Sequence, residues 1–232
     1  MKQKHIINVG FPKCGTTWLW DQVYAHPSVA KISLKENNEF LDNVDLEQYK
    51  SYYGDHAVTA NFHVMHWVID QELIQKLDTC ASHVSIILRN PYDFIERWKD
   101  WLEAVNQGLT HHSTHFYNVK FSDSEFINWC VASNVVQYKE IVSRWERNLA
   151  RAKFKVFFYE DLQNDSDTFL SRYFDFCGLE NISISGSNKP VNVNPRTVRR
   201  TLEFDDQQKN LINNEIQKFQ QTAGRDLSGW LR

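Results

Sequence analysis

The residues best suited to chemistry lie in the stretch VGFPKCGTTWLW near the start of the sequence. Gly10 and Gly15 have the spacing of the glycines in the phosphate-binding loop of nucleotide kinases, G-x-x-x-x-G-K-[ST], and Thr17 stands at its Ser/Thr position. Thr16 occupies the position of the kinase lysine, however, and Lys13 lies inside the loop instead. Backbone N–H groups and the helix dipole make such a strand–loop–helix turn an anion site. The sequence therefore predicts an anion site in which the lysine lies three residues before its position in kinases.

The displaced lysine changes which group the loop would suit. In a kinase, the lysine at the helix start reaches the terminal phosphates and the Ser/Thr hydroxyl binds Mg²⁺. A sulfuryl group carries less negative charge than a terminal phosphoryl group, so Lys13, backbone donors and the hydroxyls of Thr16 and Thr17 would suffice. Lys13 would also stabilise charge that develops on a leaving oxygen. We therefore expect no metal at this site.

The elements that would position the loop alternate between strands and helices. Strands are expected at 5–11, 83–89 and 153–160, with weaker candidates at 29–34 and 57–62. Helices are expected at 17–25, around 68–77, from Pro91 (capped by Asn90) to Gly108, over 126–149 in one or two pieces, and at 166–176 and 206–222. This alternation predicts an α/β fold with a central parallel sheet covered by helices on both faces.

The bulk composition predicts one soluble domain over residues 1–232, long enough to bury a core. The net charge of -3 argues against generic nucleic-acid binding, so a bound anion would need a local basic cluster. The four cysteines form no C-x-x-C pair and are expected to be free thiols in a reducing compartment. No apolar run is long enough to span a bilayer. We expect a cytoplasmic protein without membrane insertion, and the oligomeric state is not predicted.

The loop resembles the 5′-phosphosulfate loop of sulfotransferases, usually P-K-[ST]-G-[TS]-[TS]-x-L. The departure is Cys14, which stands at a Ser/Thr position and removes one side-chain donor. The resemblance implies a P-loop-kinase-like sulfotransferase fold. It also implies that the 5′-phosphosulfate of 3′-phosphoadenosine 5′-phosphosulfate (PAPS) is bound by Lys13, Cys14, Gly15, Thr16, Thr17 and Trp18.

A second stretch, ILRNPYDFIERW, resembles the family's 3′-phosphate strand and helix, in which R-[ND]-P is followed by a serine eight residues after the arginine. By this resemblance, Arg89 grips the 3′-phosphate with its guanidinium group. The serine position is occupied by Arg97. Arg97 either contacts the phosphate itself or pairs with Asp93, four residues earlier, on a solvated helix face.

Three weaker likenesses extend the resemblance over nearly the whole chain. Tyr159 in VFFYEDL matches a tyrosine that stacks near the adenine, and the other interpretation is a core tyrosine. NVNPRTVRR lies where the family has a basic loop over the 3′-phosphate, with Arg196 as the preferred contact and Lys189, Arg199 and Arg200 as further candidates. AGRDLSGWL is similar to the end of bacterial-type members.

The acceptor proton needs a base. SLKENNEFL resembles the stretch in which sugar and tyrosine sulfotransferases carry a glutamate base, which predicts Glu36, with Glu39 as the alternative. His63 is the runner-up, because cytosolic small-molecule sulfotransferases use a histidine; its other interpretation is a structural role. The histidines His111, His112 and His115 lack an acidic or cysteine partner nearby, which favours a polar loop over a metal site.

The resemblance thus implies sulfuryl transfer from PAPS to a hydroxyl or amine of a small-molecule or glycan acceptor, with 3′,5′-adenosine bisphosphate (PAP) as product. Glu36 would take the acceptor proton, and Lys13 would stabilise the leaving oxygen. Two alternatives stay open. One is a P-loop nucleotide or small-molecule kinase, which the missing lysine at position 16 disfavours. The other is a non-catalytic nucleotide-binding module, for which Cys14 and Arg97 leave room.

Overall fold

The structure is a computed structural model. It describes residues 3–32, 35, 45–107, 121–183 and 201–232. Residues cluster into two compact units, which are described separately. The first, called the sheet unit, comprises 1–88 and 141–192, and the second, called the helical unit, comprises 89–140 and 193–232.

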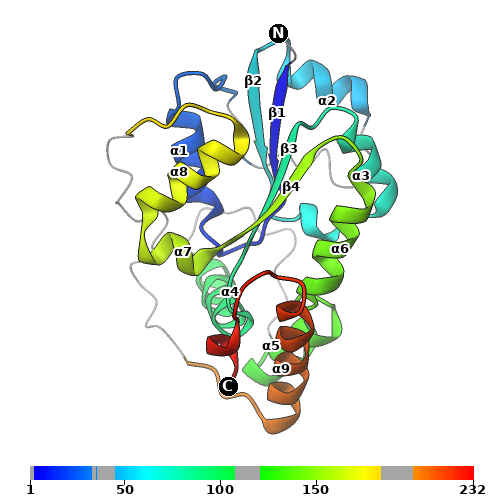
Figure 1. Cartoon of the computed structure of the whole chain (residues 1–232). Helices are drawn as coiled ribbons and strands as arrows, with labels where there is room; N and C mark the ends of the chain where they lie inside the picture. Colours follow the sequence, from blue (N-terminus) through cyan, green and yellow to red (C-terminus); the bar gives the residue numbers. More distant parts are fainter. Residues whose placement is uncertain (1–2, 33–34, 36–44, 108–120, 184–200) are drawn as a thin grey trace. The chain divides into compact units, whose positions relative to one another are not determined.

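A parallel four-stranded sheet forms the centre of the sheet unit (Figure 1). Its strands are β1 (Lys4–Asn8), β2 (Val58–Phe62), β3 (His83–Leu88) and β4 (Lys153–Phe158), in the order β2-β1-β3-β4. Each neighbouring pair is parallel. The chain therefore reverses its direction of travel across the sheet between β1 and β3, and in open α/β sheets ligands bind at the carboxyl ends of the strands at such a reversal.

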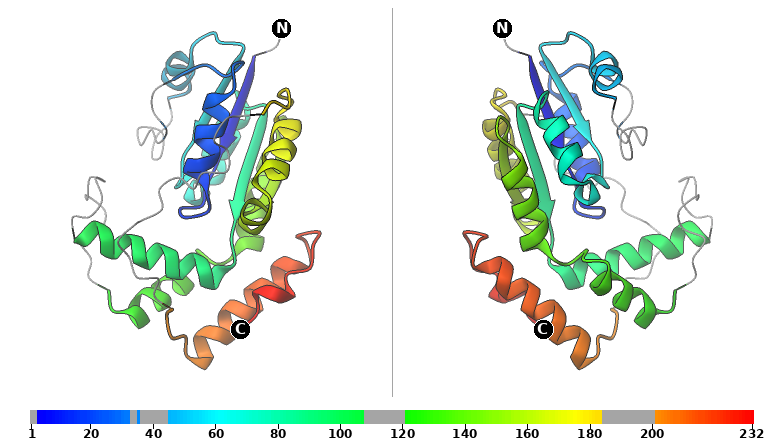
Figure 2. Two further views of the ribbon diagram at one scale, coloured as in Figure 1. Left: turned by 90° about the vertical axis from the view of Figure 1, so that its left-hand side faces the viewer. Right: turned by 90° about the vertical axis from the view of Figure 1, so that its right-hand side faces the viewer.

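Helices cover both faces of this sheet, which explains why its inner strands, β1 and β3, are buried along almost their whole length. α1 (Thr16–Ala25) and α8 (Ser166–Cys177) lie on one face, and α3 (Gln71–Asp78) and α6 (Tyr138–Asn148) lie on the other (Figures 1 and 2). α6 begins in the helical unit and continues into the sheet unit. The buried layer between sheet and helices is made of large aliphatic side chains, among them Ile6, Ile7, Val84, Ile86 and Ile87. The predicted α/β fold with a parallel sheet is confirmed.

The helical unit contains α4 (Pro91–Asn106), α5 (Asp123–Ala132) and α9 (Asp206–Gln220). The predicted start of α4 is confirmed: the Asn90 side chain accepts the N–H of Tyr92 at 3.0 Å, and Pro91 occupies the first turn. α5 and α9 are joined by a hydrogen bond of 2.8 Å from the Gln208 side-chain amide to Asn128. These contacts fix the start of α4 and hold α5 to α9.

Two α-helices of the described residues were missed by the sequence analysis, and one predicted strand was wrong. The missed elements are α2 (Leu46–Tyr53) and α7 (Tyr159–Asn164). The strand expected at 29–34 does not form over its described part, 29–32. Here the chain turns, because Val29 donates to the carbonyl of His26 at 3.1 Å and Ile32 donates to that of Ala30 at 3.1 Å. The N–H groups of Val29 and Ile32 are thus used locally, whereas Ala30 donates to the carbonyl of Val58 in β2 at 3.0 Å.

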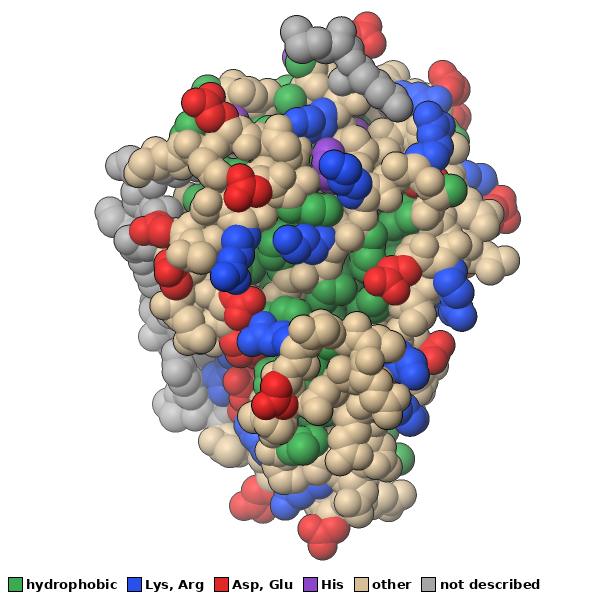
Figure 3. All heavy atoms as spheres, in the orientation of Figure 1, with side chains coloured by type: hydrophobic (Ala, Val, Ile, Leu, Met, Phe, Trp, Pro, Cys, Tyr) green, Lys and Arg blue, Asp and Glu red, His purple; other side chains and the backbone are tan. Residues whose placement is uncertain are grey.

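Charged side chains of both signs are interspersed on the molecular face drawn in Figure 3. That face carries no continuous basic surface among its described residues, in keeping with the net charge of -3. Among the helices that the structure describes, none is both long enough and apolar enough to cross a membrane.

Candidate functional site

The glycine-bearing loop follows β1 at the carboxyl end of the sheet and leads into α1 (Figure 1). Its first residues extend the pairing with β3: Ile87 donates to the carbonyl of Gly10 at 3.0 Å, and Phe11 donates to the carbonyl of Ile87 at 3.2 Å. The ring of Phe11 stacks on Trp67 with centroids 4.9 Å apart. The loop is thereby anchored at the strand order's reversal point, where a ligand is expected.

The backbone of the loop adopts conformations that favour anion binding. Lys13 has a φ of 60° and Gly15 a φ of 79°, both left-handed. Left-handed residues alternating with right-handed ones turn successive N–H groups toward a common point, which makes an anion-binding concavity. Gly15 also caps α1 and has no side chain that could occupy the helix start, where N–H groups are directed at any anion.

Gly15 is packed against α7. A Cβ atom at this position would lie 2.6 Å from Cδ2 of Leu162 and 3.3 Å from the ring of Tyr159. The structure therefore places Tyr159 beside the loop, half-buried, as the first residue of α7 rather than the last residue of a strand. Tyr159 is partly open to solvent, unlike the fully buried tyrosines of the core such as Tyr173.

Three predicted ligand contacts turn their side chains into the protein. Cys14 is fully buried, and Thr16 and Trp18 are 4% and 7% exposed. Their backbone N–H groups lie at the start of α1, where they could contact an anion. Cys14, which stands where the family usually has Ser or Thr, is therefore a core side chain in this protein.

A second lysine reaches the helix start. The ammonium group of Lys35 donates a hydrogen bond of 2.8 Å to the hydroxyl of Thr17. Burial raises the pKa of the Asp21 carboxyl, one turn further along α1, and the charge of Lys35 lowers it. The sequence analysis did not assign Lys35 to the loop. The only sequence signal was its place beside Glu36 in SLKENNEFL.

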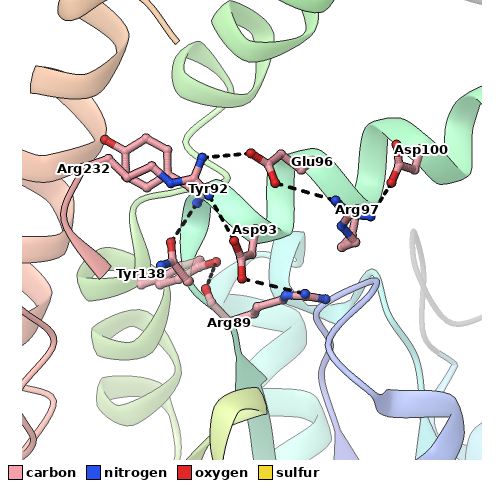
Figure 4. Close-up of polar contacts among 9 residues, drawn as sticks. Arg89, Tyr92, Asp93, Glu96, Arg97, Asp100, Tyr138 and Arg232 are labelled. Carbon is pink, nitrogen blue, oxygen red and sulfur yellow. Dashed lines mark hydrogen bonds and ion pairs between the residues drawn. The ribbon is translucent and has the colours of Figure 1, made fainter. Parts of the chain in front are cut away.

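The second predicted half of the site belongs to the helical unit and begins at Arg89, directly after β3. The carbonyl of Arg89 accepts a hydrogen bond of 2.9 Å from the hydroxyl of Tyr138. Its guanidinium group lies 3.9 Å from the carboxylate of Asp93, and the side chain is 11% exposed (Figure 4). Arg89 is thus held at both its backbone and its side chain.

Arg97 forms ion pairs with two carboxylates of its own helix. Its guanidinium group lies 2.6 Å from Asp100 and 3.7 Å from Glu96 (Figure 4). Asp93, the partner that the spacing suggested, forms ion pairs with Arg89 and, at 3.1 Å, with Arg232. Glu96 and Asp100 are 5% and 7% exposed. The setting of Arg97 therefore differs from the solvated pair with Asp93, one of the two alternatives left open for this residue, and charges attract more strongly at such buried sites.

Arg232 was also missed by the sequence analysis. It bonds Glu96 at 2.8 Å and Asp93 at 3.1 Å, and its guanidinium carbon lies 4.8 Å from the ring centre of Tyr92 (Figure 4). Nothing in the sequence pairs position 232 with α4, since more than a hundred residues separate them. Only the tertiary structure brings them together.

His63, the runner-up base, lies directly after β2. Its side chain is 2% exposed, and its Nδ1 accepts the N–H of Met65 at 3.1 Å. This bond gives His63 a role in the turn after β2, as the structural interpretation expects.

Several predicted residues lie outside the described part of the chain: Glu36, Glu39, His111, His112, His115, Lys189, Arg196, Arg199 and Arg200. Within the part described, no group of three or more His, Cys, Asp or Glu side chains could hold a metal ion. The four cysteines are free, as predicted.

The chain was compared with known proteins. A family model described as "Sulfotransferase domain" matches residues 3–228. No curated protein sequence matches closely enough to count as a relative. The solved structures that share the fold include three sulfotransferases. A sulfotransferase from Alicyclobacillus acidocaldarius has a TM-score of 0.70 at 17% identity, with 100% of both chains covered. A mouse sulfotransferase complexed with PAP has a TM-score of 0.60 at 16% identity, covering 96% of this chain and 86% of its own. The sulfotransferase domain from the curacin biosynthetic pathway has a TM-score of 0.54 at 14% identity, covering 80% and 76%.

Proposed function

Since this chain belongs to the sulfotransferase family, we propose that it transfers the sulfuryl group of PAPS to a hydroxyl or amine of its acceptor and releases PAP. The observation that supports the proposal is the loop between β1 and α1, where the left-handed backbone at Lys13 and Gly15 leads into the start of α1 and is suited to bind an anion. The mouse neighbour is complexed with PAP, the product that this reaction would release.

The chemical step follows from the charges at the loop. The acceptor oxygen or nitrogen attacks sulfur in line, and its bond to sulfur forms as the bond from sulfur to the bridging oxygen of the phosphosulfate breaks. The bridging oxygen keeps the electron pair and becomes negative, and Lys13 stabilises that charge. The acceptor proton passes to Glu36, with His63 as the alternative base. Charge and protons balance without a further reactant.

Lys35 adds a role that the resemblance did not suggest. In P-loop enzymes, the hydroxyl at the position of Thr17 binds Mg²⁺. Here that hydroxyl accepts a hydrogen bond from the Lys35 ammonium group at 2.8 Å. We infer that Lys35 supplies the positive charge that a kinase obtains from its metal ion. The donor would then bind and react without Mg²⁺.

In the helical unit, Arg89 is proposed to bind the 3′-phosphate, and Arg97 and Arg196 are further candidates for that contact. Arg89 and Arg97 already share their guanidinium groups with carboxylates in the structure. Tyr159, half-buried beside Gly15, is proposed to stack near the adenine. The acceptor is proposed to be a small molecule or a glycan.

Ligand-induced thermal stabilisation tests the donor. PAP at saturating concentration should raise the melting temperature much more than ADP, because PAP carries the 3′-phosphate that Arg89 would bind. The shift should be the same in EDTA and in Mg²⁺. Equal shifts with both nucleotides, or a shift that requires Mg²⁺, would contradict the proposal and favour a kinase. Transfer of labelled sulfate from PAPS to pooled glycans, phenols, lipids and peptides then identifies the acceptor class, and PAP binding without any transfer would indicate a binding module.

A further inference from the structure

Six charged side chains form a cluster on and around α4, called here the α4 charge cluster (Figure 4). All six belong to the helical unit. Its members are Arg89, Asp93, Glu96, Arg97, Asp100 and Arg232. Three are cations and three are anions, so the cluster has no net formal charge. Since the cluster has no excess positive charge, its attraction for a phosphate depends on how strongly each arginine is paired with the carboxylates.

Arg232 is the member held from most directions. It bonds Glu96 and Asp93, and its guanidinium carbon lies over the rings of Tyr92 and Phe204 at 4.8 Å and 5.7 Å. Two carboxylates and two aromatic faces fix the guanidinium plane more firmly than a single surface ion pair would. Arg232 therefore acts as a fixed positive charge between the two acidic residues.

Arg232 and Arg89 share one carboxylate, that of Asp93. Asp93 lies 3.1 Å from Arg232 and 3.9 Å from Arg89, so it is bound more closely by Arg232. Without Arg232, the negative charge of Asp93 would act more strongly on Arg89, and that of Glu96 would act more strongly on Arg97 at 3.7 Å. Both arginines would then be more fully neutralised by protein carboxylates. A phosphate would have to compete with those carboxylates for the same N–H donors.

We propose that Arg232 is a positioning residue that holds Asp93 back from Arg89 and thereby sets the preference for nucleotides with a 3′-phosphate. This inference rests on the proposed function, because it assigns Arg89 to the 3′-phosphate. Arg232 acts through Asp93 and need not touch the nucleotide itself.

The experiment compares two ligands that differ only in the 3′-phosphate, PAP and adenosine 5′-phosphate, by calorimetric titration at physiological ionic strength. The measured quantity is the ratio of their dissociation constants. Arg232→Met should reduce the preference for PAP by about tenfold, the worth of one good charged hydrogen bond. Arg232→Lys restores the charge and should recover most of the preference. Lys218→Met serves as the control, since it removes an equal charge from an exposed pair with Glu215 in the same unit.

A double-variant cycle tests the path through Asp93. In an Asp93→Asn background, Arg232→Met should change the ratio much less, because the carboxylate that Arg232 holds back is gone. If Arg232→Met does not fold, Arg232→Gln removes the charge while it keeps hydrogen-bond donors, and the same loss of preference is expected.

The outcomes separate this inference from the proposed function. A wild-type protein that binds both ligands equally would overturn the proposed function, and the inference with it. A wild-type preference for PAP that persists in Arg232→Met and Arg232→Gln would overturn the inference alone. The inference would also be overturned if Arg232→Met weakened the binding of both ligands equally, since that is the behaviour of a residue that only stabilises the fold. It would be overturned as well if Arg232→Met changed the ratio of dissociation constants by as much in the Asp93→Asn background as in the wild type.

Discussion

Lys13 is the residue on which the proposed chemistry depends most directly. It lies inside the loop with a left-handed backbone, close to the helix start. Lys13→Ala should lower kcat by about 10²-fold or more, while the dissociation constant of PAP changes little, because charge on the leaving oxygen builds only in the transition state. Single-turnover transfer and PAP titration measure the two effects, with Lys50→Ala on an exposed helix face as the control. An unchanged kcat with a raised KM for PAPS would mean that Lys13 only binds.

Lys35 leads to a prediction of a different kind, because its partner is the hydroxyl that binds Mg²⁺ in kinases. Lys35→Met should weaken PAPS binding and slow transfer, since the helix start loses a cation that lies beside Thr17. If the ammonium group stands in for a metal, millimolar Mg²⁺ should restore part of the activity of the variant and leave that of the wild type unchanged. Steady-state rates with and without Mg²⁺ measure this. A variant as active as the wild type would refute the role.

The base is tested by a pair of substitutions. Glu36→Gln is nearly isosteric and should preserve PAP binding, but it should lower transfer by roughly 10²- to 10⁴-fold, the usual worth of a positioned base. His63→Gln should cost much less, because Nδ1 of His63 already accepts the N–H of Met65 in the turn after β2. The reverse pattern would assign the base to His63 and would favour small phenols and alcohols as acceptors.

At the scale of elements, the contact between the loop and α7 predicts that a side chain at position 15 destabilises the fold. Gly15→Ala places a Cβ 2.6 Å from Leu162 in a left-handed backbone, so the free energy of unfolding should fall by more than the ~1 kcal/mol that this conformation alone costs. Gly224→Ala is the matched control: Gly224 has a φ of +66°, and a Cβ there would meet nothing within 4 Å. Urea denaturation compares the two variants, and equal losses would show that the contact with α7 contributes nothing.

Most of the fold could be predicted because strand and helix signals were local. β3 is mostly apolar and buried throughout, and Asn90 and Pro91 mark the start of α4. The chain at 29–32 was mispredicted because its apolar residues suggest a strand, whereas the N–H groups of Val29 and Ile32 bond to nearby carbonyls and, of these four residues, only Val29 is buried. α7 was missed because YEDLQN follows β4 without a turn residue between them.

The loop of the candidate site was predictable for the same reason, since its residues are contiguous. Lys35 and Arg232 were not, because each acts on an element from which it is distant in sequence. Spacing patterns carry no information on such tertiary contacts.

For the molecule as a whole, a buried histidine predicts how stability depends on pH. His5 is 4% exposed, and its ring bonds Thr59 at 2.7 Å and Tyr49 at 2.8 Å. Burial lowers the pKa of His5 to about 3. In the unfolded chain the group titrates near 6.5, so below that pH the unfolded state binds a proton that the folded state excludes. Stability should therefore fall as the pH drops from about 6.5 toward 3.

The contribution of His5 is at most about 1.4 kcal/mol per pH unit. Urea denaturation at pH 7 and pH 5 measures the slope, and His5→Gln should reduce it by up to that amount. An identical slope in the variant would mean that other groups cause the acid sensitivity.

That residues 1–232 form one domain, and that the enzyme works in the cytoplasm, stay predictions.

The burial of Cys14 has a consequence for how the loop can be observed. Its thiol is fully enclosed although its neighbour Lys13 is partly open to solvent. A thiol reagent can reach Cys14 only when the loop opens, whereas Cys80 is partly exposed at all times. The labelling rate of Cys14 therefore reports how often the loop opens, and no probe has to be introduced. A bound nucleotide that holds the loop closed would lower this rate.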